Sequence, residues 1–156
     1  MKLNNMFISL GSNQGDRKKF LVEALENISA KYDLISHSRI FTSKAVDHID
    51  QPDFLNMVIE CKRPECSAEE VLQVLLSIED QMGRVREFKF GPRIIDIDLL
   101  LFGEIRSSTP FLTLPHPRMW ERSFVVLPMQ DLIGFESISK IFEIPEKFSN
   151  SARPIV

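Results

Sequence analysis

One long apolar run in this chain is interrupted by two acidic residues at alternating positions. The run extends from Ile94 to Phe102, and Asp96 and Asp98 interrupt it. Side chains alternate between the two faces of a β-strand, so both carboxylates point to the same face, with Cα atoms roughly 6–7 Å apart. Two like charges destabilise an apolar strand unless a cation compensates them. The pattern therefore predicts a strand whose polar face pairs with positive charge.

Two kinds of cation can compensate this acidic pair. One is an arginine in a buried salt bridge, for which Arg93 is the nearest candidate. The other is Mg²⁺, which binds one or two carboxylates and completes its coordination with substrate phosphates, as two ions about 3.5–4 Å apart do in many phosphoryl-transfer sites. A basic loop lies immediately upstream and offers cations for such phosphates: Arg84, Arg86, Lys89 and Arg93. Because guanidinium groups bind phosphate oxygens in pairs, the acidic strand and the basic loop together favour phosphoryl chemistry.

Hydrophobic periodicity predicts the element order β-α-β-β-α-β. Alternating β-branched and apolar residues predict strands at four segments: 6–10, 34–43, 54–61 and 94–102. Asp16 and Ser67 are N-cap residues for two helices, and Glu70 completes a capping box with Ser67. A third helix is expected at 122–132, loops at 44–53, 84–93 and 103–118, and a weakly patterned polar tail at 143–156. The predicted fold is α+β, a ferredoxin-like βαββαβ core with a mainly antiparallel sheet, helices on one face and a C-terminal helical extension.

Composition limits the class of protein. The chain has 156 residues, 44% hydrophobic and 26% charged, so we expect one domain over residues 1–156. The net charge of −3 argues against a general nucleic-acid binder. Cys61 and Cys66 lack metal-ligand spacing, and no apolar run is long enough for a signal peptide or a membrane span. We therefore expect a cytoplasmic protein with free thiols; a monomer is the simplest expectation, and the sequence leaves an oligomer open.

Other residues each allow a functional and a structural interpretation. Phe54 and Asn56 point away from the core face of their strand, so they can stack on and hydrogen-bond a flat heterocycle or simply pack across strands. His116 lies between two prolines and can donate to a phosphate oxygen, or be incidental. Glu79 lies near the end of the second helix, where a solvated side chain is the simpler interpretation.

Several segments, in order and with compatible spacing, resemble one enzyme family. They are Ile8 to Asn13, Gln51 to Asn56, Gly83 to Arg86, Gly91 to Gly103, and Leu114 to Pro117 followed by Arg122 and Phe124. This pattern is similar to the 6-hydroxymethyl-7,8-dihydropterin pyrophosphokinases of folate biosynthesis (2-amino-4-hydroxy-6-hydroxymethyldihydropteridine diphosphokinases). The similarity extends over about residues 6–128. Its most specific part is the G-P-R-x-x-D-x-D block that ends at Asp98.

The resemblance implies transfer of the pyrophosphoryl group of ATP to the hydroxymethyl group of a reduced pterin, with release of AMP. It implies two Mg²⁺ ions held by Asp96 and Asp98. It implies that Arg84 and Arg93 act on the transferring phosphates. The nucleotide contacts that it implies are Glu79, Arg86, Lys89, His116 and Arg122. The pterin contacts that it implies are Ser43, Val46, Phe54, Asn56 and Phe124, with the two phenylalanines on either side of the ring.

Two other functions compete with this interpretation. A ferredoxin-like fold also hosts nucleotide- and RNA-binding modules without catalytic activity. RNA binding requires a basic, aromatic sheet face, whereas this chain is acidic and Tyr32 is its only tyrosine. An inactive relic is the other alternative, and its support is the loop at 43–47, which lacks the Pro-rich form common in the family.

Overall fold

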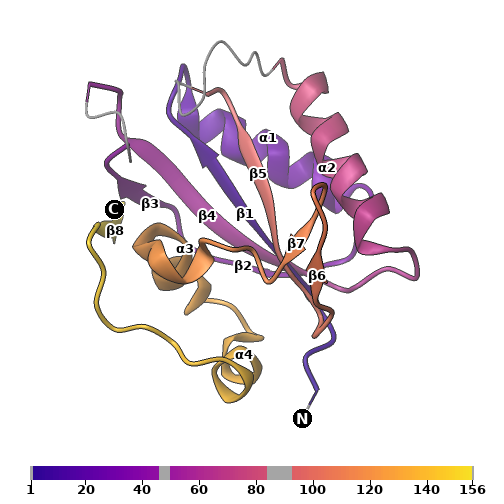
Figure 1. Ribbon diagram of the computed structural model, residues 1–156. Coiled ribbons are helices and arrows are strands. Elements are labelled where there is room, and N and C mark those ends of the chain that lie inside the picture. Colours follow the sequence, from indigo (N-terminus) through magenta and orange to yellow (C-terminus); the bar gives the residue numbers. More distant parts are fainter. Residues whose placement is uncertain (1, 46–49, 84–92, 156) are drawn as a thin grey trace.

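The structure is a computed structural model that describes residues 2–45, 50–83 and 93–155. Its centre is a six-stranded sheet in the order β5-β1-β4-β3-β8, with β2 also paired to β4 (Figure 1). All of the described pairings in this sheet are antiparallel. The strands are β1 (Met6–Ser12), β2 (Leu34–His37), β3 (Phe41–Ser43), β4 (Phe54–Cys61), β5 (Asp96–Phe102) and β8 (Ala152–Pro154). With β2 and β3 taken as one interrupted strand, this is the predicted ferredoxin-like arrangement.

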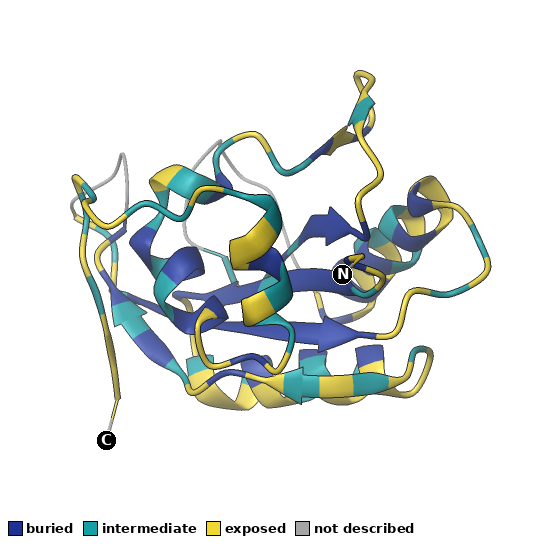
Figure 2. Ribbon diagram, turned by 90° about the horizontal axis from the view of Figure 1, so that it is seen from below, coloured by how far each residue is buried: buried dark blue, intermediate teal, exposed yellow. Residues whose placement is uncertain are grey.

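Helices cover both faces of the sheet. The helices α1 (Arg17–Ser29) and α2 (Ala68–Gln81) pack on one face, where Ile8 of β1 and Met57 of β4 belong to the same apolar cluster as Leu21 and Leu75. The helices α3 (Ser123–Met129) and α4 (Phe135–Ile141) cover the other face, where the cluster includes Phe7, Val58 and Val125. Figure 2 shows buried central strands between helices whose outer sides are exposed. The predicted extension therefore forms a third layer, which buries the sheet on both sides.

The helix caps that the sequence predicts are present. The Asp16 carboxylate accepts a hydrogen bond from the Lys19 N–H at 3.2 Å and caps α1. Ser67 Oγ accepts from the Glu70 N–H at 3.2 Å and caps α2. After α2, Gly83 has a φ of +89°, a conformation that glycine adopts at little cost and that ends a helix.

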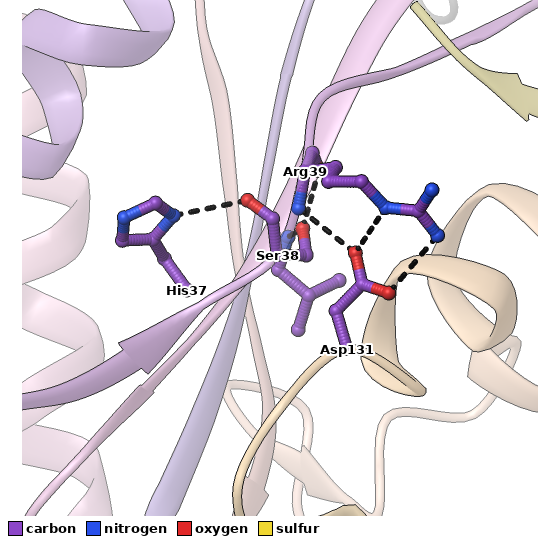
Figure 3. Close-up of polar contacts among 5 residues, drawn as sticks. His37, Ser38, Arg39 and Asp131 are labelled. Atoms are coloured by element: carbon purple, nitrogen blue, oxygen red, sulfur yellow. Dashed lines mark hydrogen bonds and ion pairs between the residues drawn. The ribbon is translucent and has the colours of Figure 1, made fainter.

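The prediction of one strand over 34–43 is wrong, because the chain leaves the sheet after Ser38, whose N–H still donates to the Val58 carbonyl at 2.9 Å. Ser38 Oγ accepts from the Val58 N–H at 2.9 Å and donates to the Arg39 carbonyl at 2.7 Å. The Arg39 N–H and guanidinium bind Asp131, which lies after α3, and His37 Nδ1 lies 3.0 Å from the Ser38 carbonyl (Figure 3). Side-chain bonds that replace ladder bonds therefore separate β2 from β3.

The predicted helix at 122–132 is also shorter than expected. It ends at Met129, and α4 follows after a turn that β4 fixes in place. Glu60 of β4 accepts from the Gly134 N–H at 2.9 Å, and a Cβ at Gly134 would collide with the Glu60 carboxylate. The segments predicted as loop and tail also contain ordered elements: β6 (Ser107–Ser108), β7 (Thr113–Leu114) and β8. A short 3₁₀ helix (Met119–Glu121) lies between the predicted loop and the predicted third helix.

Both cysteines are free thiols, as predicted. Cys61 is buried in β4, and burial, followed by the nearby Glu60 and Asp33 charges, raises its pKa to about 12. This thiol therefore stays protonated and serves as a small apolar core residue. In the described ranges, no helix has both the length and the apolar character needed to cross a bilayer.

Candidate active site

Asp96 and Asp98 begin β5 and lie on one face of it, as the alternation predicts. They stand opposite Gly11 and Ser9 of β1, while Ile97 between them is buried in the core. The side chains of Asp96 and Asp98 are 26% and 30% exposed. This end of the strand therefore presents two carboxylates that solvent or a ligand can reach.

An arginine faces each of these carboxylates. Arg93 Nε lies 3.6 Å from Asp96 Oδ2, and Arg122 Nη1 lies 3.9 Å from Asp98 Oδ2. Both separations are longer than a good N–H···O hydrogen bond, so these are ion pairs of loose geometry. The salt-bridge interpretation is thus correct for Arg93, although the pair is partly exposed rather than buried.

The same two arginines also lie over phenylalanine rings. The guanidinium carbon of Arg93 is 5.0 Å from the centre of the Phe54 ring, and that of Arg122 is 5.7 Å from the Phe124 ring. Both distances are within cation–π range. Two Asp–Arg–Phe triplets result, one from Asp96, Arg93 and Phe54 and the other from Asp98, Arg122 and Phe124. They bring acidic, basic and aromatic groups from β5, β4 and the start of α3 to one end of the sheet.

Phe54 and Asn56 lie on the face of β4 opposite α1 and α2, but they are buried, so the interpretation of Phe54 as an exposed ring on an open strand face is wrong. They are 9% and 5% exposed, because α3 and the Arg93 side chain cover that face of β4. Asn56 Nδ2 donates to Ser43 Oγ at 2.8 Å, which links β4 to β3. A Cβ at Gly11 would lie 3.4 Å from Asn56 Oδ1, so this end of β1 runs close beside the amide.

His116 is held by its own backbone and by the residue two positions later. Its N–H donates to the Leu100 carbonyl at 2.9 Å, and its Nδ1 accepts from the Arg118 N–H at 3.3 Å. Burial and then the charge of Arg122 lower its pKa to about 4, while Asp96 acts in the opposite direction. The imidazole is therefore neutral at pH 7. Because Nδ1 accepts, Nε2 carries the hydrogen and is the atom that can donate to a ligand.

Glu79 is buried against β5, so its interpretation as a solvated helix residue is wrong. The side chain is 2% exposed, and its Oε2 accepts from the Ile97 N–H at 2.7 Å. Among the described strands of this sheet, β5 pairs with β1 alone, so a side chain from α2 supplies the acceptor that an edge strand lacks. Glu79 thereby holds the backbone between Asp96 and Asp98, and its implied contact with the nucleotide stays a prediction.

Asn13 is a site residue that the sequence analysis missed. Its Oδ1 accepts from the Arg93 N–H at 2.8 Å, and its own N–H donates to the Arg93 carbonyl at 3.1 Å. Its Nδ2 donates to Gln51 Oε1 at 3.0 Å and to the Pro52 carbonyl at 3.4 Å. This fully buried amide joins the segment before β5 to the segment before β4. The sequence feature that could have indicated this role is the position of Asn13 directly after a strand, because an asparagine side chain both donates and accepts hydrogen bonds.

Some predicted site residues fall outside the described part of the chain. Val46, Arg84, Arg86 and Lys89 are among them, so their roles stay predictions. Within the described residues, no group of three or more His, Cys, Asp or Glu side chains could hold a metal ion. An ion bound at Asp96 and Asp98 would therefore take further ligands from phosphates or water, as Mg²⁺ commonly does.

Comparison with known proteins identifies the family. Residues 7–134 match the family described as 7,8-dihydro-6-hydroxymethylpterin-pyrophosphokinase, or HPPK. The chain belongs to this family. It is 39% identical over 133 residues to the 2-amino-4-hydroxy-6-hydroxymethyldihydropteridine pyrophosphokinase of Bacillus subtilis (strain 168), covering 83% of this chain and 79% of that one. The enzyme of the same name from Aquifex aeolicus (strain VF5) is 35% identical over 127 residues, covering 81% and 79%.

Other HPPK relatives are much longer than this chain. The Folic acid synthesis protein fol1 of Pneumocystis carinii is 40% identical over 131 residues, which cover 83% of this chain but 17% of that protein. A crystal structure of Plasmodium falciparum HPPK-DHPS with pteroate aligns with a TM-score of 0.63 at 16% identity, covering 85% of this chain and 40% of that one. At this identity the likeness concerns the fold, and it confirms the predicted HPPK architecture. The HPPK match ends at residue 134, so α4 and the tail lie beyond it.

Proposed function

We propose that this chain transfers the pyrophosphoryl group of ATP to the hydroxymethyl group of 6-hydroxymethyl-7,8-dihydropterin, releasing AMP, as a step of folate biosynthesis. Membership of the HPPK family supports the reaction class. The two Asp–Arg–Phe triplets carry the assignment to this end of the sheet. They combine oxygen ligands for a cation, cations for phosphates and aromatic faces for a flat ring.

Asp96 and Asp98 fit Mg²⁺, and we propose that they hold two ions. Both are hard oxygen donors, both are partly exposed, and they share one face of β5. Bound Mg²⁺ would neutralise phosphate charge and orient the triphosphate. In the protein alone, Arg93 and Arg122 compensate the carboxylates; with ATP bound, we propose that these guanidiniums turn to the phosphate oxygens. Arg84, Arg86 and Lys89 would add to this positive environment.

Phe54 and Phe124 would place the pterin ring between them, close to the carboxylates. Their rings already lie under the two arginines that face Asp96 and Asp98. The hydrogen bond from Asn56 Nδ2 to Ser43 Oγ orients the amide so that Oδ1 can accept from ring N–H groups. Val46 would line the same pocket. Catalysis would then depend on positioning and on electrostatic stabilisation of the transferring group.

The nucleotide would contact His116 and Glu79 on the other side of the acidic pair. His116 is neutral and donates from Nε2, which suits a phosphate or ribose oxygen. We also propose that residues 1–156 act as one domain, because α4 and β8 pack on the same sheet as the matched region. The free thiols fit a reducing compartment such as the cytoplasm.

The direct test is to incubate the protein with ATP, Mg²⁺ and 6-hydroxymethyl-7,8-dihydropterin and to separate the nucleotides. We expect AMP and the pterin diphosphate in equal amounts, and no AMP when EDTA removes Mg²⁺. ADP in place of AMP would contradict pyrophosphoryl transfer. Nucleotide binding without turnover would favour the binding module or the inactive relic.

A further inference from the structure

The C-terminal tail, residues 142–155, returns to the proposed site although it lies beyond the family match. It leaves α4, passes along the α3 side of the molecule and ends as β8 beside β3 (Figure 1). Its contacts there are with the start of α3 and with the edge of β3. These two elements carry Arg122 and Phe124 on one side and Ser43 on the other.

The first contact is with α3, a helix that its own N-cap residue does not cap. A helix begins with backbone N–H groups that have no partner within the helix, and Ser, Thr, Asp or Asn at the N-cap usually accepts from one of them. In α3 the N-cap residue is Arg122, whose side chain makes no capping bond. An arginine has no acceptor to offer. Its guanidinium instead lies 3.9 Å from Asp98.

Asn150 supplies the missing cap from the tail. Its Oδ1 accepts from the Ser123 N–H at 2.8 Å and from Ser123 Oγ at 2.5 Å. Its Nδ2 donates to the Glu121 carbonyl at 2.9 Å, so the amide bridges the two sides of Arg122. Ser123 is 1% exposed, so in the folded chain its N–H and hydroxyl have Asn150 rather than water as their partner.

The second contact concerns the opposite wall of the site. In β8, Ala152 stands opposite Ser43, and the Ile155 N–H donates to the Ile40 carbonyl at 2.9 Å. This pairing covers the outer edge of β3, the strand whose Ser43 accepts from Asn56. The tail therefore contacts both sides of the proposed site, the start of α3 through Asn150 and β3 through Ala152.

We propose that Asn150 is a positioning residue for the pterin site, because it caps α3 from the tail and so leaves the N-cap position to Arg122. A self-capping Ser or Asp at position 122 could not reach Asp98 and lie over Phe124 as this arginine does. The kinetic part of this inference rests on the proposed function, whereas the capping itself does not.

Without the Oδ1 acceptor, the first turn of α3 loses its partner and opens more often. Arg122 and Phe124 are then in place for a smaller fraction of the time. The loss of an N-cap corresponds to a roughly five- to thirtyfold change in that equilibrium. We expect the exchange protection of the Ser123 N–H in Asn150→Ala to fall by roughly this factor and the pterin KM to rise by up to this factor. We expect kcat to change less, because Asp96, Asp98 and Arg93, which are proposed to act on the phosphates with Arg122, lie outside α3.

The experiment compares three variants of the full chain. Asn150→Ala removes the cap, Asn150→Asp keeps an acceptor for Ser123, and Ser149→Ala changes the exposed neighbour as a matched control. Steady-state kinetics give KM and kcat, and amide hydrogen exchange gives the protection of the Ser123 N–H. We expect Asn150→Ala to lose protection of the Ser123 N–H and to gain KM together. Asn150→Asp should lie between it and the wild type, because it keeps the acceptor but loses the bond from Nδ2 to the Glu121 carbonyl. Ser149→Ala should stay close to the wild type.

A wild-type pterin KM in folded Asn150→Ala would overturn the inference, even if the variant unfolded at a lower temperature. Asn150→Asp as impaired as Asn150→Ala would overturn it too, because Oδ1 would not be the acting atom. If Asn150→Ala does not fold, Ser123→Ala removes one of the two bonds to Oδ1, and a smaller rise in KM is expected; no rise would count against the inference. A wild-type protein that releases no AMP would defeat the proposed function alone, since the exchange of the Ser123 N–H still tests the cap.

Discussion

Two pairs of carboxylates in this molecule differ in how they are held. Asp131 accepts from the Arg39 N–H, Nε and Nη2 at 2.9, 3.0 and 3.2 Å (Figure 3). Burial raises the pKa of Asp131, but its hydrogen bonds and ion pair with Arg39 outweigh this and lower the pKa overall. Asp96 and Asp98 face their arginines at 3.6 and 3.9 Å, beyond hydrogen-bond length. The first geometry fixes a chain turn, and the second leaves the ion pair able to rearrange around a ligand.

Glu60 is the second acid that, like Asp131, holds the fold through short hydrogen bonds. It is 2% exposed and accepts from Asn5 Nδ2 at 2.7 Å, from Ser36 Oγ at 2.8 Å and from the Gly134 N–H at 2.9 Å. Glu60 attaches the turn between α3 and α4 to the sheet, and Asp131 attaches it to the segment between β2 and β3. In this comparison Glu60 and Asp131, on the α3–α4 side, stabilise the fold, whereas we propose that Asp96 and Asp98 on β5 serve the chemistry.

The strongest test of this division removes the charge of one site carboxylate and keeps the shape of its side chain. We expect Asp96→Asn or Asp98→Asn to lower AMP formation at least about a hundredfold, because an amide is a poor Mg²⁺ ligand and the negative charge of the transition state then loses the cation that stabilises it. The unfolding midpoint should change little, since both side chains are partly exposed. Asp131→Asn is the matched control and should keep kcat. Full activity in both site variants would break the comparison.

The second test concerns Glu60, for which we expect a loss of stability and little change in activity. Glu60→Ala leaves three donors without their acceptor in a buried place, which should lower the free energy of unfolding by roughly 2–4 kcal/mol. Below the transition, kcat should stay near the wild-type value. Glu136→Ala is the control: it removes an exposed ion pair with Lys140 on α4 and should change stability by less than about 0.5 kcal/mol. A Glu60 variant that is stable but inactive would contradict the comparison, because Glu60 would then act in the site rather than in the stability of the fold.

Elements with a local cause were predictable from the sequence. The caps at Asp16 and Ser67 act within one helical turn, and the alternation around Asp98 depends only on strand geometry. The split between β2 and β3 was not predictable, because Arg39 leaves the ladder to bind Asp131, which is 92 positions away in sequence. The same limit hid β8, since a short polar strand has no pattern until its partner strand is known.

The site followed the same rule. Asp96 and Asp98 stood out because charges on an apolar strand are unusual. Asn13 did not, because its role lies in bonds to Arg93, Gln51 and Pro52, which only the fold brings together. Glu79 was misplaced for a related reason: helical spacing indicates which face of a helix is buried, but not that an edge strand needs an acceptor there.

The smallest expected effect is on the pH dependence of the free energy of unfolding, which differs between His116 at the site and Asp131 on the α3–α4 side. Burial, and then Arg122, lower the pKa of His116 to about 4 from an ordinary value of 6.5, so between these values the unfolded chain binds the proton more readily than the folded one. The free energy of unfolding should therefore fall by roughly 1–3 kcal/mol as the pH drops from about 6.5 to about 4. Denaturant titrations at several pH values measure this slope.

His116→Gln should flatten that slope, because it removes the titrating group from the site end of the molecule. Asp131→Asn should leave the slope unchanged above pH 4.5, since the lowered pKa of Asp131 places its own contribution at more acidic pH, where stability is lost as the carboxylate becomes protonated. If His116→Gln keeps the wild-type slope, the burial of this histidine does not control the acid sensitivity of the fold.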